Sequence, residues 1–546
     1  MCPKQANKFR GIRNKEGMYD ILIKNGTVID GSGRPMFRSD IAINEDRIVA
    51  LGDFTHARAE KEIDATGKYI TPGFVDVNNH SDTYWQLLAD PKLESMVRQG
   101  VTTIIGGNSG SSLAPLTHPD VIRSIQKWTD VEKINFNWLS MAEFLREVEK
   151  RRPAVNFATL VGHGTLRRGA MKDETRSIVP DEIAVMQRFL KEALKEGAIG
   201  LSTGLKYTHA RGAGIREIVT LARTAVSSGG VYATYVRDEE ENLVKAVEEA
   251  LLVARETGAP IHISHLKAVG EKNWHLMDEV FNLIETAALH DTAVTFDVYP
   301  YTSTGSVLYT LLPEWVTQNG RKMMIERLKD RQTYLTVLRD MRNNDTDYSQ
   351  ILIAVSTLSK MLSRRRISEI ADLQGKSPQE VVLDLLLASD GRAIVSMEAL
   401  SDKNVLKAIQ HPFSIISSNG AGYDLAHAET GDLVHPRSFG TFPKVFAEYV
   451  RREKAISWEE AVHKMTGKPA MKFQLEKRGL IEKGYFADIV IFDPETIEDT
   501  ATMEDPYQYP IGISQVIVNG EVTLEEGVFF ERNGVVLRKK RSLFPW

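Results

Sequence analysis

Cysteine is almost absent from this chain of 546 residues, because Cys2 is the only one. A disulfide within the chain is therefore excluded, and so is a metal site or a nucleophile built from cysteine in the body of the protein. The length also excludes a small scaffold held together by disulfides. The cysteine content is compatible with a reducing compartment.

Long hydrophobic runs and an excess of positive charge are missing as well. No window reaches the roughly 18 apolar residues of a membrane-spanning helix, and residues 1–17 are basic and polar without the apolar core of a signal peptide. The 68 Lys and Arg against 73 Asp and Glu give a net charge of -5, which provides no overall positive field for nucleic acid or a membrane. We expect a cytoplasmic protein with a disordered basic tail over 1–17 and a small-molecule partner. Assembly into a homo-oligomer is compatible with these features.

The two ends of the chain share one pattern. From about residue 20 to 70, and again after about residue 488, short apolar runs are cut by turn residues, as expected for hairpin strands. A different pattern separates them. We therefore predict one small β-sandwich domain that is built from residues 18–71 and 481–546 together.

The middle of the chain, residues 72–480, alternates short β-branched runs with amphipathic helical stretches. Eight such runs occur, at 74–80, 102–108, 156–164, 198–204, 231–236, 260–266, 294–300 and 413–420. Eight strands that alternate with helices predict an α/β fold of the (β/α)8 TIM-barrel type. The last two runs are separated by more residues than an ordinary loop contains, so we predict an inserted helical subdomain near 312–405.

Polar residues gather where the predicted barrel strands end, which is the edge that carries the chemistry in such barrels. These residues include Asn78, His80, Ser109, His163, Tyr207, Tyr235, His265, Lys267, Tyr299, Ser303 and Asn419. The imidazoles of His80 and His265 are suitable zinc ligands, but two donors are fewer than the three or four that zinc requires. The alternative is a hydrogen-bonded polar network.

Two further residues have open roles from the sequence alone. His163 lies between glycines in VGHGTLRR, where it could serve a ligand or the fold. Arg437, in HPRSFG, has the planar guanidinium that suits a carboxylate, and a salt bridge within the barrel is the alternative.

Several segments, in order along the chain, resemble one known family. They include DILIKNGTVIDGSG, TPGFVDVNNHSD, LVGHGTLR, YATYVRDE, ISHLK, DVYPYTSTGS, HPRSFGTFPKVFAEYVR and KGYFADIVIFDP. The resemblance is to the amidohydrolase superfamily, and most closely to its N-acyl-D-amino-acid deacylase (D-aminoacylase) family, over about residues 18–540. It implies a metal-activated water that attacks an amide carbonyl, with an aspartate at the end of strand eight moving the proton.

The residues at the positions implied by this resemblance differ from the family pattern at four of six places. The family's H-x-H motif reads Asn78-Asn79-His80, its cysteine ligand is Ser109 and its first single histidine is Tyr235. His265 is retained, whereas Asn419 replaces the aspartate. By contrast, the positions that resemble the family's substrate-binding residues are kept: Tyr207, Tyr299, Ser303 and Arg437.

We therefore expect a pocket that recognises an N-acyl amino acid or a dipeptide-like amide and has lost most of its metal ligands. The candidate catalytic residues are His265, His80, Tyr235, Ser109 and Asn419, and His163 joins the candidate substrate-binding residues. No cofactor is expected. Any chemistry is then metal-free or altered. The alternatives are a zinc-dependent deacylase with a rebuilt site of His80 and His265 together with His163 or His209, and a binding protein without catalysis.

Overall fold

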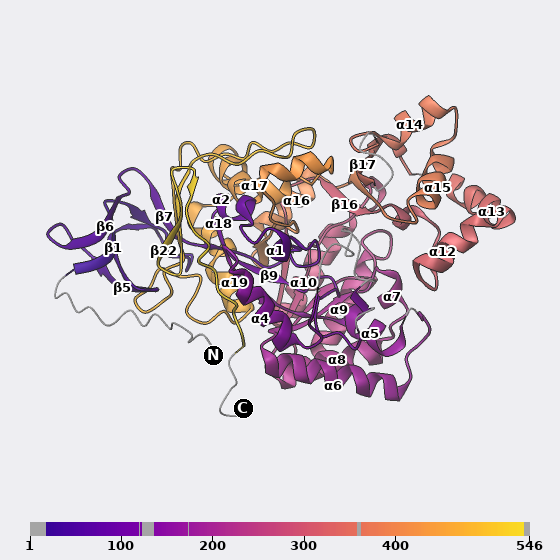
Figure 1. Cartoon of the computed structure of the whole chain (residues 1–546), viewed down its shortest axis with the longest axis horizontal. Helices are drawn as coiled ribbons and strands as arrows, with labels where there is room; N and C mark the ends of the chain where they lie inside the picture. Colours follow the sequence, from indigo (N-terminus) through magenta and orange to yellow (C-terminus); the bar gives the residue numbers. More distant parts are fainter. Residues whose placement is uncertain are drawn as a thin grey trace, which may run out of the picture.

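The computed structural model describes residues 18–118, 121–122, 136–172, 174–344, 346–356 and 362–539. The predicted tail over 1–17 lies outside these residues. A β-rich part forms one end of an elongated molecule, a barrel of strands and helices lies in the middle, and helices α12 to α15 form the other end (Figure 1).

The β-rich end combines two sheets. The first has the order β5-β4-β1-β6, from Arg47–Gly52, Asp40–Asn44, Met18–Lys24 and Arg58–Asp64. The second has the order β23-β22-β21-β20-β7-β2-β3, from Val528–Phe529, Glu521–Glu525, Ile513–Val518, Ile489–Phe492, Tyr69–Pro72, Thr27–Val28 and Phe37–Arg38. Strand β7 pairs antiparallel with β20, and isoleucines from both chain ends share one core. A β domain built from both ends is thus confirmed.

The barrel contains all eight predicted strands, parallel to one another. They are β8 (Phe74–Asp76), β9 (Val101–Gly106), β10 with β11 (Asn156–Thr159 and Val161–Gly162), β12 (Gly200–Gly204), β13 (Val231–Tyr235), β14 (Ile261–Ile263), β15 (Val294–Val298) and β19 (Ser414–Ile416). The helices between them include α4 (Met141–Arg151), α5 (His163–Met171), α6 (Pro180–Glu196), α8 (Ile215–Ser227), α9 (Leu243–Thr257), α10 (Leu276–Leu289) and α16 (Asp402–Gln410). The predicted TIM-barrel fold is confirmed.

The first and last barrel strands, β8 and β19, are joined by a carboxylate. The backbone N–H of Ser418 donates to Asp76 at 2.9 Å, its hydroxyl donates to the same carboxylate, and the amide of Asn79 donates at 2.9 Å. The N–H of His80 donates to the carbonyl of Gly420 at 2.8 Å. Burial nevertheless raises the pKa of Asp76 to about 6, because these hydrogen bonds only partly offset the desolvation of its charge.

The insert between the last two barrel strands contains a sheet as well as helices. Strands β16 (Ser303–Val307), β18 (Ala393–Glu398) and β17 (Ile351–Ser356) form an antiparallel sheet in that order. Helices α12 (Gly320–Lys329), α13 (Arg331–Arg342), α14 (Ile367–Gln374) and α15 (Pro378–Ala388) share a separate hydrophobic core. The expectation of a helical insert is therefore incomplete. Within the described part of the chain, no helix is long and apolar enough to cross a membrane.

Candidate functional site

A cavity of about 110 Å³ lies at the carboxyl ends of the barrel strands, under strand β16 of the insert. Eight of the residues predicted from the sequence line it: His80, Ser109, Tyr207, Tyr235, His265, Lys267, Asn419 and Arg437. The barrel thus brings together side chains that are far apart in the sequence, because the ends of parallel strands meet at one face.

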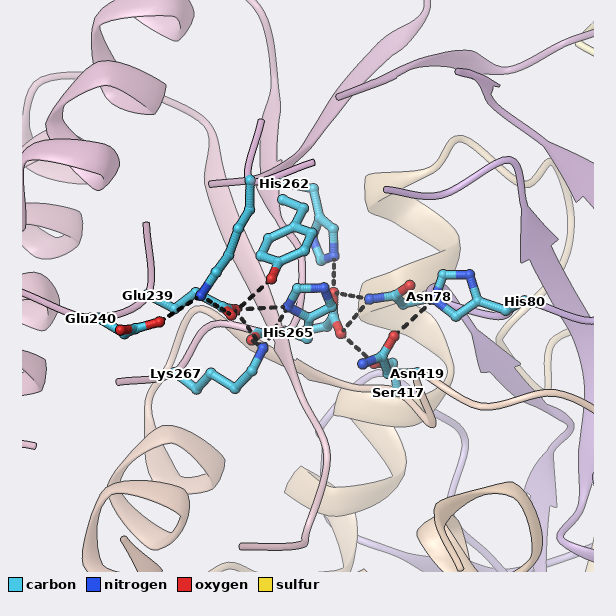
Figure 2. A network of polar contacts seen from close by, with 12 residues as sticks. Asn78, His80, Glu239, Glu240, His262, His265, Lys267, Ser417 and Asn419 are labelled. Carbon is cyan, nitrogen blue, oxygen red and sulfur yellow. Dashed lines mark hydrogen bonds and ion pairs between the residues drawn. The ribbon is translucent and has the colours of Figure 1, made fainter. Parts of the chain in front are cut away.

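One side of this cavity is an ion-pair network around Glu239, which is buried (Figure 2). The ammonium of Lys267 is hydrogen-bonded to the Glu239 carboxylate and lies 2.9 Å from Nδ1 of His265. The phenol of Tyr235 donates to Glu239 at 3.0 Å. Further out, Nζ of Lys206 lies 3.0 Å from the carboxylate of Glu240.

This network fixes the protonation of its members. Burial alone would raise the pKa of Glu239, but the charge of Lys267, the contact with His265 and the charge of Lys206 together outweigh it and hold that pKa well below the usual range. Burial and the same ammonium lower the pKa of His265, so its imidazole is neutral near pH 7. Burial and the Glu239 carboxylate raise the pKa of Tyr235 far above 10, and its phenol therefore remains a donor.

A second network lies deeper in the barrel, around Asp297. Its carboxylate accepts from the amide of Asn78 at 3.3 Å and from the hydroxyl of Ser417, and it lies 2.9 Å from Nε2 of His262. Burial alone would raise the pKa of Asp297, but the hydrogen bond and the charge of His262 lower it. The Asn78 side chain is thus engaged inside the barrel.

Three buried ionisable members of these networks were missed from the sequence: Glu239, His262 and Asp297. His262 and Asp297 stand inside the apolar runs of β14 and β15, where a polar residue must find a partner within the barrel. That pattern could have revealed them. Glu239 stands in a run of acidic residues, a pattern that is typical of a solvated surface.

The seam between β8 and β19 also contributes to the site. Nε2 of His80 lies 2.8 Å from the side-chain oxygen of Asn419, so the retained histidine contacts the residue that stands in the place of the family's aspartate. An amide oxygen accepts a hydrogen bond there but does not take up a proton near neutral pH, as a carboxylate can.

The backbone at the mouth adopts an unusual conformation at three candidate residues. Ser109, His265 and Asn419 have φ angles of 52°, 39° and 46°. This left-handed region is uncommon for residues with a side chain and costs of order 1 kcal/mol or more at each position. Such conformations cluster at functional sites, where they aim a side chain.

The other side of the cavity is formed by Arg437, which begins helix α17 (Arg437–Lys444). Its side chain is only 6% exposed, and within the described residues its Nε and Nη1 atoms have no hydrogen-bond partner. The guanidinium lies 5.0 Å from the ring centre of Tyr299. A buried guanidinium with unused donors is suited to bind an anion.

Ser303 and Tyr299 support this arginine rather than line the 110 Å³ cavity. The Ser303 hydroxyl is 2.9 Å from Nε2 of His435, and the backbone N–H of Arg437 donates to Nδ1 of the same imidazole at 3.1 Å. Burial and the Arg437 charge lower the pKa of His435 well below its usual value. The neutral imidazole thus connects Ser303 to the start of α17.

His163 is placed differently from the expectation. Its side chain is fully buried, and Nε2 lies 2.8 Å from Glu217, which also pairs with Arg167 at 3.1 Å. The described residues that line the cavity do not include His163. It begins helix α5, which directs it toward α8, and this placement gives no support to contact with a substrate.

The donors at the mouth do not match what a tightly held zinc ion requires. His80 and His265 offer imidazoles, whereas Ser109, Tyr235 and Asn419 offer neutral oxygens, which are weak zinc ligands. No group of three or more His, Cys, Asp or Glu side chains that could hold a metal ion occurs in the part of the chain described above. Zinc sites in proteins normally use at least three such donors.

Comparisons with known proteins agree with the architecture. The model of the amidohydrolase family matches residues 61–524. D-aminoacylase from Alcaligenes xylosoxydans xylosoxydans is 36% identical over 94% of this chain and 96% of its own length. N-acyl-D-aspartate deacylase from the same organism is 35% identical, with 96% of both chains covered.

Two solved structures extend this comparison. A crystal structure of D-aminoacylase superposes with a TM-score of 0.80 and 36% identity, covering 95% of this chain and 100% of its own. N-acyl-D-glutamate deacylase from Bordetella bronchiseptica, in complex with zinc and a phosphonate inhibitor, gives a TM-score of 0.81 at 30% identity, with 96% of this chain and 100% of that chain covered. The chain therefore belongs to the amidohydrolase family and resembles its N-acyl-D-amino-acid deacylases.

Proposed function

We propose that the cavity recognises an N-acyl amino acid, or a dipeptide-like amide with a carboxylate beside the amide bond. The observation that carries this proposal is the buried Arg437 guanidinium, whose Nε and Nη1 have no partner among the described residues. A carboxylate would satisfy both donors in the bidentate geometry that arginine favours. Tyr299 beneath the guanidinium and Tyr207 across the cavity shape the rest of the site.

In this arrangement the amide group of the ligand faces His80, His265 and Asn419. We assign no tightly bound zinc to the site, because the donor set is too poor for it. Of these three residues, His80 and His265 carry imidazoles that can accept a proton, whereas the amide of Asn419 cannot, so any remaining chemistry is altered relative to a zinc deacylase. The alternative function, binding of the ligand without turnover, depends on the same contacts with Arg437, His80, His265 and Asn419.

Binding of N-acetyl amino acids, measured by calorimetry, tests the role of Arg437. Arg437→Ala should weaken binding by about 1.5–3 kcal/mol, the range for hydrogen bonds to charged groups. Arg34→Ala is the matched control, since Arg34 lies in the β domain with its side chain 76% exposed, and it should leave binding unchanged. Equal affinity of the wild type and Arg437→Ala would contradict the assignment.

Elemental analysis tests the metal assignment. The purified protein should contain well under one zinc ion per chain. Stoichiometric zinc that survives dialysis would instead favour a zinc-dependent N-acyl-D-amino-acid deacylase with a rebuilt site.

Restoring the family's pattern provides the converse test. The combined variant Asn78→His, Ser109→Cys, Tyr235→His and Asn419→Asp should gain zinc and some hydrolysis of N-acetyl-D-amino acids. Asn419→Asp alone should gain neither, because a general base without the metal-activated water leaves the reaction near its background rate.

A further inference from the structure

A second and larger cavity adjoins the site. It has a volume of about 590 Å³, compared with about 110 Å³ for the first. The two cavities share four lining residues, Tyr84, Gly305, Asn419 and Arg437. Because the carboxylate-binding candidate Arg437 and the amide-facing Asn419 both border the two spaces, a ligand held by them can extend from one into the other.

The walls of the second cavity are mainly apolar. Strands β17 and β18 of the insert contribute Val355, Ile394 and Val395, and the segment between β19 and α17 contributes Leu433 and Val434. Apolar walls of this kind bind by removing hydrocarbon from water.

One polar side chain in this wall lacks a partner. The hydroxyl of Ser396 lies on β18, its residue is 5% exposed, and it makes no hydrogen bond within the described residues. A buried hydroxyl without a partner costs free energy that an ordered water recovers, since hydrocarbon offers it no acceptor. Arg437 and Ser396 are thus two buried side chains of this wall that have polar atoms without a partner among the described residues.

The volume restricts what the second cavity accommodates. A cavity of about 150 Å³ is enough for a benzene ring, so one aromatic side chain would fill a minor part of this space. The volume lies within the range of about 300–1,000 Å³ that is typical of small-molecule sites. The part of an N-acyl amino acid that can be much larger than a side chain is its acyl chain.

We propose that the second cavity holds a long apolar acyl chain, so that the ligand class is an N-acyl amino acid with a fatty rather than an acetyl group. This inference rests on the proposed function, because it assumes the carboxylate at Arg437 and the amide beside Asn419. The acyl chain then passes Gly305 and Asn419 and lies between the insert sheet and the segment before α17.

Calorimetry on the full chain with two ligand series tests this inference. The first series is N-acetyl-, N-butanoyl-, N-hexanoyl- and N-octanoylglycine, and the second is both enantiomers of N-acetylalanine, N-acetylleucine and N-acetyltryptophan. Each buried methylene should tighten binding about fourfold in the first series. The second series should change little. A gain in the second series with a flat first series would overturn the proposal and make this cavity a side-chain subsite.

A cavity-filling variant sharpens the result. Ile394→Trp should remove the dependence on acyl-chain length and leave the affinity for N-acetylglycine unchanged, whereas Leu335→Trp, on the exposed face of α13, should preserve both. A chain-length dependence that persists in a folded Ile394→Trp protein would overturn the assignment. If N-acetylglycine binds but chain length has no effect in the wild type, this inference fails and the proposed function stands. If no member of either series binds, both fail.

Discussion

Each side of the barrel mouth carries a buried cationic side chain, and the two differ in their hydrogen-bond partners. Lys267, on the β14 side, is 8% exposed and is bonded to the Glu239 carboxylate and His265. Arg437, on the α17 side, is 6% exposed, and two of its nitrogens have no partner within the described residues. Burial alone therefore does not identify a ligand site. Under the proposed function, the cation with unused donors binds the ligand, whereas the paired cation belongs to the scaffold.

Breaking the ion pair of Lys267 with Glu239 should have the largest effect on stability. Lys267→Met should lower the free energy of unfolding by about 3–5 kcal/mol, because it leaves the buried Glu239 carboxylate without its counter-charge. Urea denaturation measures this loss. The double variant Lys267→Met with Glu239→Gln should recover a large part of it, and a loss below 1 kcal/mol for the single variant would show that the pair is not the scaffold inferred here.

The Asp76 carboxylate, at the seam between β8 and β19, should make the stability of the protein depend on pH although it is hydrogen-bonded. Since the folded-state pKa of Asp76 is raised to about 6, the folded protein holds this proton more tightly than the unfolded chain, whose Asp titrates near 4. Its contribution to stability is thus present below about pH 4 and is lost as the pH rises through 6.

Asp76→Asn removes this titration. Its destabilisation relative to wild type should therefore shrink by about 2–3 kcal/mol between pH 4 and pH 7. Denaturation curves of both proteins across this range give the difference. A destabilisation that is constant with pH would mean that Asp76 titrates near its usual value.

Removing Arg437, two of whose nitrogens have no partner among the described residues, should change stability in the opposite direction. Arg437→Met should raise the free energy of unfolding of the ligand-free protein by about 1–2 kcal/mol, because an unsatisfied buried group is costly. The same variant should lose ligand binding, the trade between stability and function that is typical of binding sites. A clear destabilisation without ligand would indicate that the guanidinium is paired in solution.

The smallest effect is expected at the rim. The ammonium of Lys206 lies 3.0 Å from Glu240, whose side chain is 51% exposed, and only at the longer distance of 4.0 Å from the buried Glu239 carboxylate. Lys206→Met should change the unfolding free energy by about 0.2–1 kcal/mol, and added salt should reduce even this difference. A salt-independent loss of several kcal/mol would place Lys206 with the buried network around Glu239.

The barrel could be predicted from the sequence because each strand is a short β-branched run between helical stretches. The insert sheet could not, since β16 reads STGSV, with a glycine and two serines that carry no strand signal. Its pairing with β18 depends on contacts between segments far apart in the chain.

The position of the site could also be predicted from the sequence, because the strand ends in a barrel converge. Its pairings were not: the sequence places Lys267 at the mouth but does not say that Glu239, on the loop after β13, meets it. His163 shows the same limit. Its position between glycines left a ligand role and a role in the fold open, whereas the structure places it at the start of helix α5, pointing to Glu217.

The pairing of β7 with β20 has a consequence for synthesis of the chain. Ile70 lies opposite Ile491 in this ladder, so the N-terminal strands acquire this neighbour only after the whole barrel has left the ribosome. Until then the edge of β7 is open to pairing with other chains. The β domain is thus the first part to be translated and among the last to be completed, and interrupted synthesis should yield aggregation-prone fragments.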